Sequence, residues 1–316
     1  MGRFIARRLL GAIPLLVGIT IISFMFMHLM PGGPDSLYAR SGRMNQEQLD
    51  AIRQNMGLDQ PVVVQYTRWV GNLVRGDLGN SYVQFRPVRD IILERLPNTM
   101  LLVGAGLVIA VTFSLIFGIV AAIYQYSFFD HLFSFVSFFG MAMPVFWFGL
   151  MLQLLFAVQL GWLPTSGMGS MDDGGIVERI RHLILPASVL GVGSIAFWSR
   201  YVRSSMLEVI RQDYMRTARA KGLREWSVFS RHALKNALIP FVTVIGIDIP
   251  LYFVGAVVTE TIFSWPGMGR LFYDSLNARD YPVLMGLLIF SAVLIVIGNL
   301  IADIAYAYLD PRIKYS

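Results

Sequence analysis

Carboxylates within apolar stretches are the residues of this 316-residue sequence best placed to do chemistry. Asp248 lies near the middle of one such stretch, and Glu260 and Asp303 lie near the ends of two stretches. A charge at the centre of a bilayer costs about 2.5 to 3.5 kcal/mol on insertion scales, so carboxylates at that depth pair, take up protons or line a path for a solute. Two kinds of chemistry therefore stay open: proton carriage by Asp248 and Glu260, and recognition of a charged solute by Asp248.

The sequence lacks the patterns that enzymes and metal sites require. It contains no cysteine, no G-x-x-x-x-G-K-[ST] loop for nucleotide phosphates, and no nucleophile accompanied by a base. Its four histidines are scattered without metal-ligand spacing: His28, His131, His182 and His232. We therefore predict no catalytic residue, no metal ligand and no cofactor on this chain, which cannot hydrolyse ATP by itself.

The composition predicts the elements that position these groups. Hydrophobic residues make up 55% of the chain and charged residues 15%, and the mean hydropathy is +0.59, values typical of a polytopic membrane protein. A helix needs about 20 apolar residues to cross a bilayer. The stretches that qualify are Leu9–Met30, Asn98–Tyr124, Leu132–Leu160, Leu183–Ser199, Asn236–Phe263 and Val283–Leu309. The expected fold class is an all-α membrane protein with six transmembrane helices, the fourth being the shortest.

The charge distribution favours a defined topology over nucleic-acid binding, although the pI is near 9.6. Basic residues precede the first stretch, dominate residues 200–235 and recur after the last stretch, and six spans would bring all three regions to one side. The positive-inside rule then places both termini in the cytoplasm. The first stretch resembles a signal peptide, but it lacks a small-residue cleavage pattern and five more spans follow, so we predict a retained helix.

Residues 200–240 are the long polar interruption in the second half of the chain. Residues 200–235 contain nine Lys or Arg and three acids. Apolar residues recur there at the three- and four-residue steps of one helical face: Leu207, Ile210, Tyr214 and Ala218. Gly222 then breaks the run, and a second polar helix over 223–234 leads to Pro240. The pattern predicts a helix, a glycine turn and a helix, and one interpretation is a basic hairpin that only sets topology.

Two runs within this interruption resemble a known family. Asp213 to Gly222 (DYMRTARAKG) and Arg231 to Pro240 (RHALKNALIP) are similar to the cytoplasmic loop of binding-protein-dependent ABC importer permeases of the dipeptide and oligopeptide class. Shorter phrases of that class occur at 31–34, 57–61, 76–79, 95–99 and 259–270. The resemblance therefore extends over nearly the whole chain.

The resemblance implies a type I ABC importer permease fold and the role of a permease subunit in the plasma (inner) membrane of a prokaryote. Such a subunit forms half of a pathway through the lipid bilayer. Its expected partners are a second homologous permease, two ATPase subunits that are identical or different, and a solute-binding protein. ATP and magnesium would then belong to the ATPase subunits. Di- and oligopeptides are the expected solutes, and nickel chelates, glutathione and oligosaccharides stay open as alternatives.

The resemblance also implies a short coupling helix that docks in a groove on the ATPase. Docking requires an exposed amphipathic helix, small residues for close approach, arginines for surface acids and a glycine for the turn. The matching positions are Arg216, Thr217, Ala218, Arg219, Ala220, Lys221, Gly222 and Leu223. The rival interpretation, an ion-driven transporter or channel, leaves this basic segment unexplained, and no internal inverted repeat is visible.

Three residues are candidates for the translocation pathway. Asp248 stands where the family more often has a neutral amide, and it could bias the pathway toward solutes with a cationic group, such as a peptide amino terminus. The alternative is a buried, hydrogen-bonded or protonated carboxyl that fixes helix packing. Pro144 and Trp147 belong to a predicted proline kink with bulky aromatics, which would face the bundle and either line the pathway or pack in the core.

Structural roles are expected for Glu260, Asp303 and Pro240. We expect Glu260 to pair with Arg270, and Asp303 to pair with arginines at the cytoplasmic ends of the spans. The predicted organisation is a tail and first helix over 1–30, an extracytoplasmic helical insertion over 31–97, a five-helix core over 98–310 that includes the coupling loop 200–235, and a cytoplasmic tail over 311–316.

Two helices are expected within the insertion. A capping box formed by Asn45 and Gln48 would begin the first, which Gly57 would close, and Pro61 would begin the second. The insertion could contact a solute-binding protein, shape the outer mouth of the pathway, or serve as a structural addition.

Overall fold

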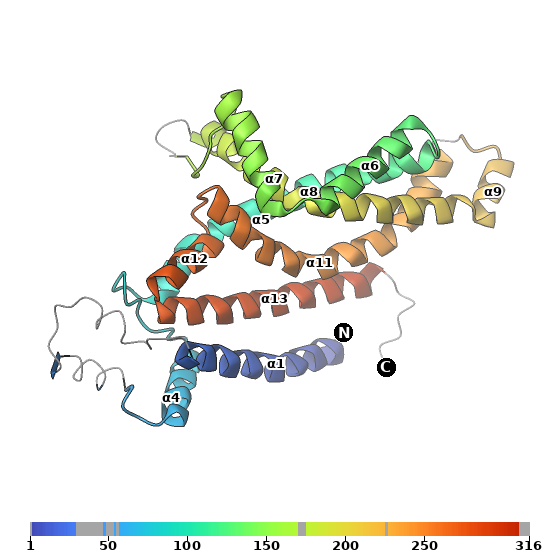
Figure 1. Cartoon of the computed structure of the whole chain (residues 1–316). Helices are drawn as coiled ribbons and strands as arrows, with labels where there is room; N and C mark the ends of the chain where they lie inside the picture. Colours follow the sequence, from blue (N-terminus) through green and yellow to red (C-terminus); the bar gives the residue numbers. More distant parts are fainter. Residues whose placement is uncertain are drawn as a thin grey trace. The chain divides into compact units, whose positions relative to one another are not determined.

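The chain is helical in nearly all the parts that its structure, a computed structural model, describes: residues 2–29, 47–48, 54, 57–169, 175–224 and 227–309. Figure 1 shows the long helices, joined by shorter helices and turns. They are α1 (Gly2–Leu29), α4 (Val62–Val74), α5 (Val88–Ile123), α6 (Phe128–Ala142), α7 (Val145–Leu152), the π-helical η1 (Gln153–Gln159), α8 (Gly175–Ile210), α9 (Asp213–Ala220), the π-helical η2 (Val228–Leu234), α11 (Lys235–Ile262), α12 (Met268–Ala278) and α13 (Tyr281–Leu309). The predicted capping residue Asn45 and the predicted tail 311–316 lie outside the described residues, and the side chain of Asp303 is likewise not described.

The chain divides into two compact units. The smaller unit consists of residues 1–97 and 270–297, and the larger unit consists of residues 98–269 and 298–316. Two helices, α5 and α13, begin in the smaller unit and continue into the larger one.

In the smaller unit, α4 packs against the second half of α1. The hydroxyls of Thr20 and Tyr66 are 2.9 Å apart, and the rings of Tyr66 and Trp69 flank the buried ring of Phe24. Pro61 directly precedes α4, which confirms the predicted helix start. Proline suits this position because its φ already matches the helix and its missing N–H is not needed there.

The start of α13 is tied to the loop before α5 by a buried carboxylate. Asp280 is 2% exposed and accepts hydrogen bonds from the Ser81 hydroxyl and from the Tyr82 N–H, the latter at 3.0 Å. Close packing follows within the smaller unit, since a Cβ at Gly286 of α13 would lie 2.6 Å from a methyl carbon of Val88. The loop and the first turn of α13 therefore form one rigid corner of this unit.

In the larger unit, α8 packs against α11, α6 and α7. Trp198, Val202 and Met206 of α8 are completely buried in its core. The backbones of α5 and α8 approach closely, because a Cβ at Gly118 would lie only 2.6 Å from the carbonyl oxygen of Ser199. Small residues permit such close approach between membrane helices.

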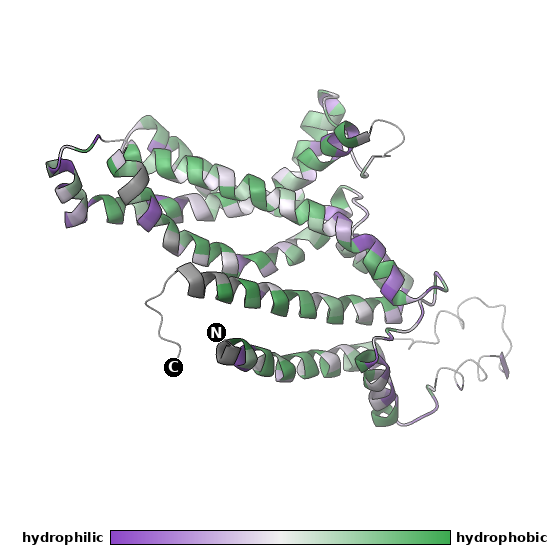
Figure 2. Cartoon of the chain, turned by 180° about the vertical axis from the view of Figure 1, so that it is seen from behind, coloured by the Kyte–Doolittle hydropathy of each residue, from purple (hydrophilic) through white to green (hydrophobic). Residues whose placement is uncertain are grey.

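The predicted membrane spans agree with the helices. Among the described residues, five helices are long and apolar enough to cross a bilayer, and a bent pair, Phe128–Ala142 with Val145–Gln159, makes six if it counts as one span. Hydrophobic residues line these helices, whereas α9 is hydrophilic (Figure 2). The all-α class is confirmed for the described residues, and the helices provide the six predicted spans when the bent pair is counted as one. The second and fourth helices are longer than predicted, since α5 begins at Val88 and α8 runs from Gly175 to Ile210.

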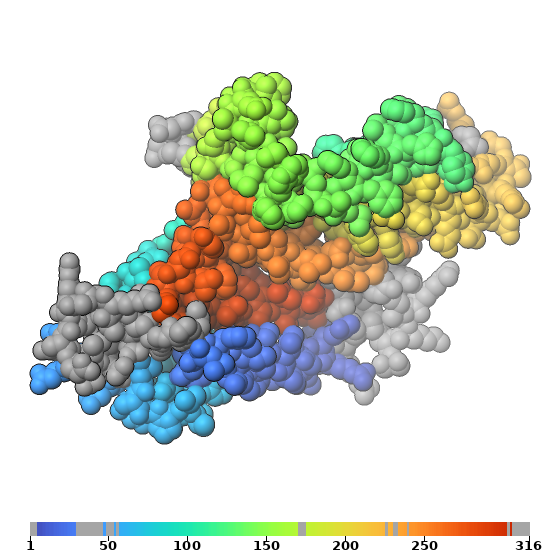
Figure 3. All heavy atoms as spheres, in the orientation of Figure 1, coloured from blue at the N-terminus to red at the C-terminus, as the bar shows by residue number. Residues whose placement is uncertain are grey.

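The predicted proline kink in the third span is instead a break. The axes of the two helices differ by 109°, and both Met143 and Pro144 adopt extended backbone conformations between them. The residue before a proline avoids the helical region, and proline is well suited to begin a helix, so α6 ends and α7 starts anew. Many large hydrophobic side chains of α6 and α7 are exposed on the surface of the larger unit (Figure 3).

The polar interruption also differs from its prediction in one respect. Leu207 and Ile210 belong to the end of the long helix α8, while Tyr214 and Ala218 belong to the separate helix α9. The chain breaks between them at Gln212, which has an extended conformation with ψ of 149°. The two parts of the predicted single helix can therefore point in different directions.

Candidate functional site

The short helix α9 forms the core of the predicted coupling segment. Two of its residues, Met215 and Ala218, are buried and join a core cluster that includes Val228 and Ala233 from η2. Residues three apart lie on one face of a helix, so these two side chains attach α9 to the rest of the larger unit. Of the positions that we assigned to coupling, Ala218 therefore faces inward and provides this attachment.

The opposite face of α9 is open. Apart from Met215 and Ala218, every residue from Arg211 to Arg224 is exposed. The exposed coupling positions are Arg216, Thr217, Arg219, Ala220, Lys221, Gly222 and Leu223. A contact of 3.6 Å links Arg216 to Asp213, and both side chains are mostly exposed, so this pair contributes little to stability.

Gly222 ends this segment with a left-handed turn. Its φ is +74°, and its N–H donates a hydrogen bond of 2.9 Å to the carbonyl of Arg219. A side chain would be strained at this φ, although no atom lies within 4 Å of the position that its Cβ would take. The glycine turn predicted from the sequence is confirmed, and it redirects the chain from α9 toward η2.

A buried ion pair supports the end of the bundle that precedes α9. The guanidinium of Arg203 on α8 binds both oxygens of Asp130 on α6, with each N–O distance at 2.7 Å. The Tyr126 N–H donates a further 3.0 Å hydrogen bond to Asp130, whose side chain is 4% exposed. This pair was not predicted from the sequence, because Asp130 and Arg203 are 73 residues apart in the chain.

Asp248 of α11 faces α8 rather than the exposed side of its own helix. It accepts a 2.7 Å hydrogen bond from the indole N–H of Trp198, which is completely buried. The exposed side of α11 instead carries Ile247, Leu251 and Val254. This geometry suits the packing role that we kept as an alternative, although Asp248 is only half-buried.

Pro144 and Trp147 do not lie in the core of the chain. Pro144 precedes the first residue of α7, and Trp147 is 43% exposed. The neighbouring Phe148 is the one that packs inward, against a small cluster that includes Leu185 and Phe263. Trp147 therefore remains available to a pathway, to lipid or to another subunit.

Glu260 lies at the centre of a closed polar turn. It is completely buried, and its two carboxylate oxygens accept hydrogen bonds of 2.7 Å from the Thr99 hydroxyl and from the Gly269 N–H. The side-chain amide of Asn98 on α5 donates a hydrogen bond to the Pro266 carbonyl, and the indole N–H of Trp265 donates one to the Asn98 carbonyl. These contacts agree with the structural role predicted for Glu260, and they join the start of the larger unit's part of α5 to the turn that follows α11.

The other two residues with predicted structural roles, Pro240 and Asp303, lie within long helices. Pro240 lies inside α11 near its start, where the preceding turn is π-helical in η2. Asp303 lies in α13, but its side chain is outside the description, so its predicted pairing stays a prediction.

No metal centre forms in the part of the chain that the structure describes. The histidines, aspartates and glutamates there do not gather in groups of three or more. The polar features of the larger unit are thus helix-linking contacts and one exposed basic helix. They define a polytopic membrane protein with a surface segment suited to docking, rather than a site for bond chemistry.

Comparison with known families agrees with this class. Residues 114–315 match the family described as "Binding-protein-dependent transport system inner membrane component", and residues 1–103 match "Binding-prot-dependent transport system membrane comp, N-term". The chain belongs to this family of transport-system membrane components, and it is a multi-pass inner-membrane protein.

Curated relatives align along the full chain. The oligopeptide transport system permease protein AppB of Bacillus subtilis is 48% identical over 317 residues, which cover 100% of both chains. The di/tripeptide transport system permease protein DppB of Pseudomonas aeruginosa is 41% identical over 334 residues, covering 100% of this chain and 99% of the relative.

A solved structure shows the same fold. A chain of the MetNI methionine ABC transporter in an inward-facing conformation superposes with a TM-score of 0.57 at 14% identity. The alignment covers 70% of this chain and 96% of that one. The fold is therefore that of a type I ABC importer permease, as predicted.

Proposed function

We propose that this chain is the permease subunit of an ATP-driven importer and forms half of the membrane pathway for di- and oligopeptides. A solute-binding protein delivers the peptide, and ATPase subunits bind ATP and magnesium and supply the energy. The observation that carries the proposal is α9, a basic helix that is attached by Met215 and Ala218 and exposed on its other face.

The geometry of α9 supports docking on an ATPase subunit. The exposed face offers Arg216, Arg219 and Lys221 to acidic groups on a partner, and the exposed Ala220 permits close approach. Met215 and Ala218 transmit the movement, because they join α9 to η2 and the end of α8 through one core cluster. A rigid displacement of α9 would thus reach the membrane helices.

The peptide substrate is supported by the relatives, whose names describe oligopeptide and di/tripeptide transport over the full length of the match. Nickel chelates, glutathione and oligosaccharides are the competing solutes. An ion-driven transporter finds less support, because Asp248 and Glu260, its proposed proton carriers, each hold helix-linking hydrogen bonds.

The full assembly that we propose contains this chain, a second homologous permease, two identical or different ATPase subunits and the solute-binding protein. Both termini and α9 face the cytoplasm, where the ATPases are. Asp248, Pro144 and Trp147 remain candidates for the pathway, of which Trp147 is exposed on this chain and Asp248 is directed toward α8.

Purification of the tagged chain from its native membrane in mild detergent tests the assembly. We expect mass spectrometry to identify an ATPase with a G-x-x-x-x-G-K-[ST] loop and a second permease in stoichiometric amounts. Reconstitution of that complex with its binding protein should then give ATP-dependent uptake of short peptides. A chain that purifies alone and moves solute in vesicles without ATP would overturn the proposal.

A further inference from the structure

The smaller unit contains a cavity of about 540 Å³ to which no role has been assigned above. Its walls come from α1, the turn at 57–60, α4, the loop at 77–85 and the start of α13, all within that unit. Its volume falls in the range of about 300 to 1,000 Å³ that is usual for small-molecule sites. The cavity is thus large enough to hold a small solute, and it is open to solvent, because Arg68, Asn72 and Asp77 are exposed.

The polar face of α4 lines this cavity. Gln65, Arg68 and Asn72 follow one another at steps of three and four residues, which puts them on one side of the helix, and all three are cavity residues. The apolar face carries Tyr66 and Trp69 to the contact with Phe24 of α1. The amphipathic pattern of α4 therefore serves two surfaces, an apolar contact with α1 and a polar cavity wall.

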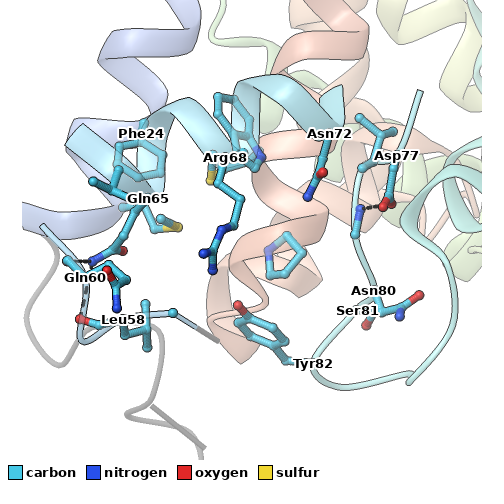
Figure 4. A pocket seen from close by; sticks show the side chains of 18 of the residues that line it. Phe24, Leu58, Gln60, Gln65, Arg68, Asn72, Asp77, Asn80, Ser81 and Tyr82 are labelled. Carbon is cyan, nitrogen blue, oxygen red and sulfur yellow. Dashed lines mark hydrogen bonds between the residues drawn. The ribbon is translucent and has the colours of Figure 1, made fainter. Parts of the chain in front are cut away.

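Arg68 presents a positive charge to the cavity. Its side chain reaches into the space between Gln60 and Tyr82 (Figure 4). No hydrogen bond or ion pair joins it to any other residue that the structure describes. The guanidinium also lies against the backbone of Gly57, where a Cβ would be only 2.8 Å from its Nη1 atom, so the glycine makes room for it.

Gln65 differs from Arg68 because its amide is already engaged. Its nitrogen donates to the carbonyls of Leu58 and Gln60, and its oxygen lies 3.1 Å from a ring nitrogen of His28. These bonds hold the 57–60 turn against α1 and α4. The cavity wall beside Arg68 is therefore preformed in the absence of a ligand.

A carboxylate of opposite charge occupies another wall. Asp77 lines the cavity, and one of its oxygens accepts a 2.9 Å hydrogen bond from the Gly79 N–H, which fixes its position. The cavity thus offers one guanidinium and one carboxylate between aromatic walls that include Trp69 and Tyr82. A guanidinium binds a carboxylate through two parallel hydrogen bonds, and an aspartate suits an ammonium group.

We infer that this cavity binds a short peptide as a zwitterion, with the peptide's terminal carboxylate on Arg68 and its amino group toward Asp77. The inference rests on the proposed function, since it deepens the assignment of peptides as substrates. It adds a peptide site within the smaller unit, separate from Asp248, Pro144 and Trp147 of the larger unit.

Binding of trialanine to the full chain in nanodiscs, without the other subunits, tests the site. We expect Arg68→Gln to weaken binding about tenfold or more, because it removes a charge-assisted bidentate contact. The affinity of Arg68→Lys should fall between those of the unaltered chain and Arg68→Gln, since lysine keeps the positive charge but cannot donate two parallel hydrogen bonds. Arg75→Gln is the matched control, because Arg75 follows the same helix and does not line the cavity.

Ligand variants identify the two ends of the peptide. Trialanine amide, which lacks the carboxylate, should bind weakly to the unaltered chain and equally weakly to Arg68→Gln. N-acetyl-trialanine, which lacks the charged amino group, should bind weakly to the unaltered chain and equally weakly to Asp77→Asn. The Asp77→Asn change keeps an oxygen that can accept the hydrogen bond from the Gly79 N–H. Equal binding of trialanine and its amide, or unchanged binding by Arg68→Gln, would overturn the inference.

One further outcome would assign the cavity to a protein partner instead. If trialanine does not bind the chain, but Arg68→Gln weakens capture of the solute-binding protein, the guanidinium receives an acidic side chain of that protein and the peptide site is wrong. Uptake by the whole importer separates these failures from failure of the proposed function. Peptide uptake that persists when the binding tests fail removes only the site, whereas absence of peptide uptake removes the function itself.

Discussion

The larger unit contains two polar segments that differ in burial. They are the coupling segment at 211–224, whose polar groups are exposed, and the Glu260 turn at 259–269, whose central carboxylate is buried. In the Glu260 turn, the buried carboxylate accepts hydrogen bonds from the Thr99 hydroxyl and the Gly269 N–H. In the coupling segment, basic side chains face outward and only Met215 and Ala218 are buried.

The difference separates structural polarity from functional polarity. A buried polar group costs free energy unless it is hydrogen-bonded, so the Glu260 turn must satisfy itself within the chain. The coupling segment lies in solvent and meets no such demand. Changes to its exposed charges should therefore alter transport more than stability.

Replacement of Glu260 should have the largest effect. Glu260→Ala removes the acceptor for two buried donors, and we expect a loss of about 3 kcal/mol or more in the free energy of unfolding. Chemical denaturation in mixed micelles measures this loss. Asp213→Ala, at an exposed residue of α9, is the control and should change stability by less than about 0.5 kcal/mol. Equal stability of the two variants would contradict the comparison.

Gly222→Pro should abolish coupling and leave the chain folded. Proline cannot adopt the φ of +74° found here, and it also removes the N–H that donates to Arg219. We expect ATP-dependent uptake to fall about tenfold or more in the reconstituted importer, a change within the usual range of coupling energies. The membrane helices should stay folded, because Gly222 is exposed and lies outside them.

Gly222→Asn is the matched control for this change. Asparagine tolerates the left-handed conformation better than other residues with a side chain, and no atom lies within 4 Å of its Cβ. Uptake should therefore stay near that of the unaltered protein. Normal uptake and normal ATPase stimulation in Gly222→Pro would show that this turn has no part in coupling.

Asp130→Asn tests the ion pair with Arg203, whose burial is intermediate between that of the Glu260 turn and that of the coupling segment. The change leaves Arg203 without its charged partner, and since Arg203 is 28% exposed, water offsets part of the loss. We expect a cost of about 1 to 3 kcal/mol in unfolding free energy, less than for Glu260. A double variant, Asp130→Asn with Arg203→Gln, should recover part of this cost. A double variant whose losses simply add would mean that the two residues act independently.

Asp248→Asn should have the smallest effect on stability. Asparagine retains an oxygen for the indole of Trp198, so we expect a change below about 1 kcal/mol. The informative measurement is uptake of cationic, neutral and anionic peptides. Unchanged ratios among the three would exclude a pathway role for the Asp248 charge, whereas a selective loss of cationic peptides would support one.

Much of the fold could be predicted because membrane spans are local features. The predicted span Asn236–Phe263 corresponds to α11 (Lys235–Ile262), and the predicted span Val283–Leu309 corresponds to α13 (Tyr281–Leu309). Local turn chemistry was equally informative at Pro61 and Gly222. In each case the chain within a few residues determines the outcome, through bilayer length or allowed φ.

The break at Met143 and Pro144 shows where local rules stop. The proline was recognised, but a kinked helix and two helices at 109° both satisfy its backbone restrictions. The direction of α7 depends on Phe148 packing with Leu185 and Phe263, residues far away in the chain. Sequence proximity carries no information about such contacts.

The sequence by itself determined the all-helical class, the positions of the long apolar helices, the absence of a nucleotide-binding loop and the position of an exposed basic turn at Gly222. Tertiary structure alone decided which charges are satisfied: Glu260 by Thr99, Asp130 by Arg203 and Asp248 by Trp198. It also decided that Arg68 faces a cavity. The physical reason is that burial and hydrogen bonding depend on three-dimensional neighbours, whereas span length and backbone preference are properties of consecutive residues.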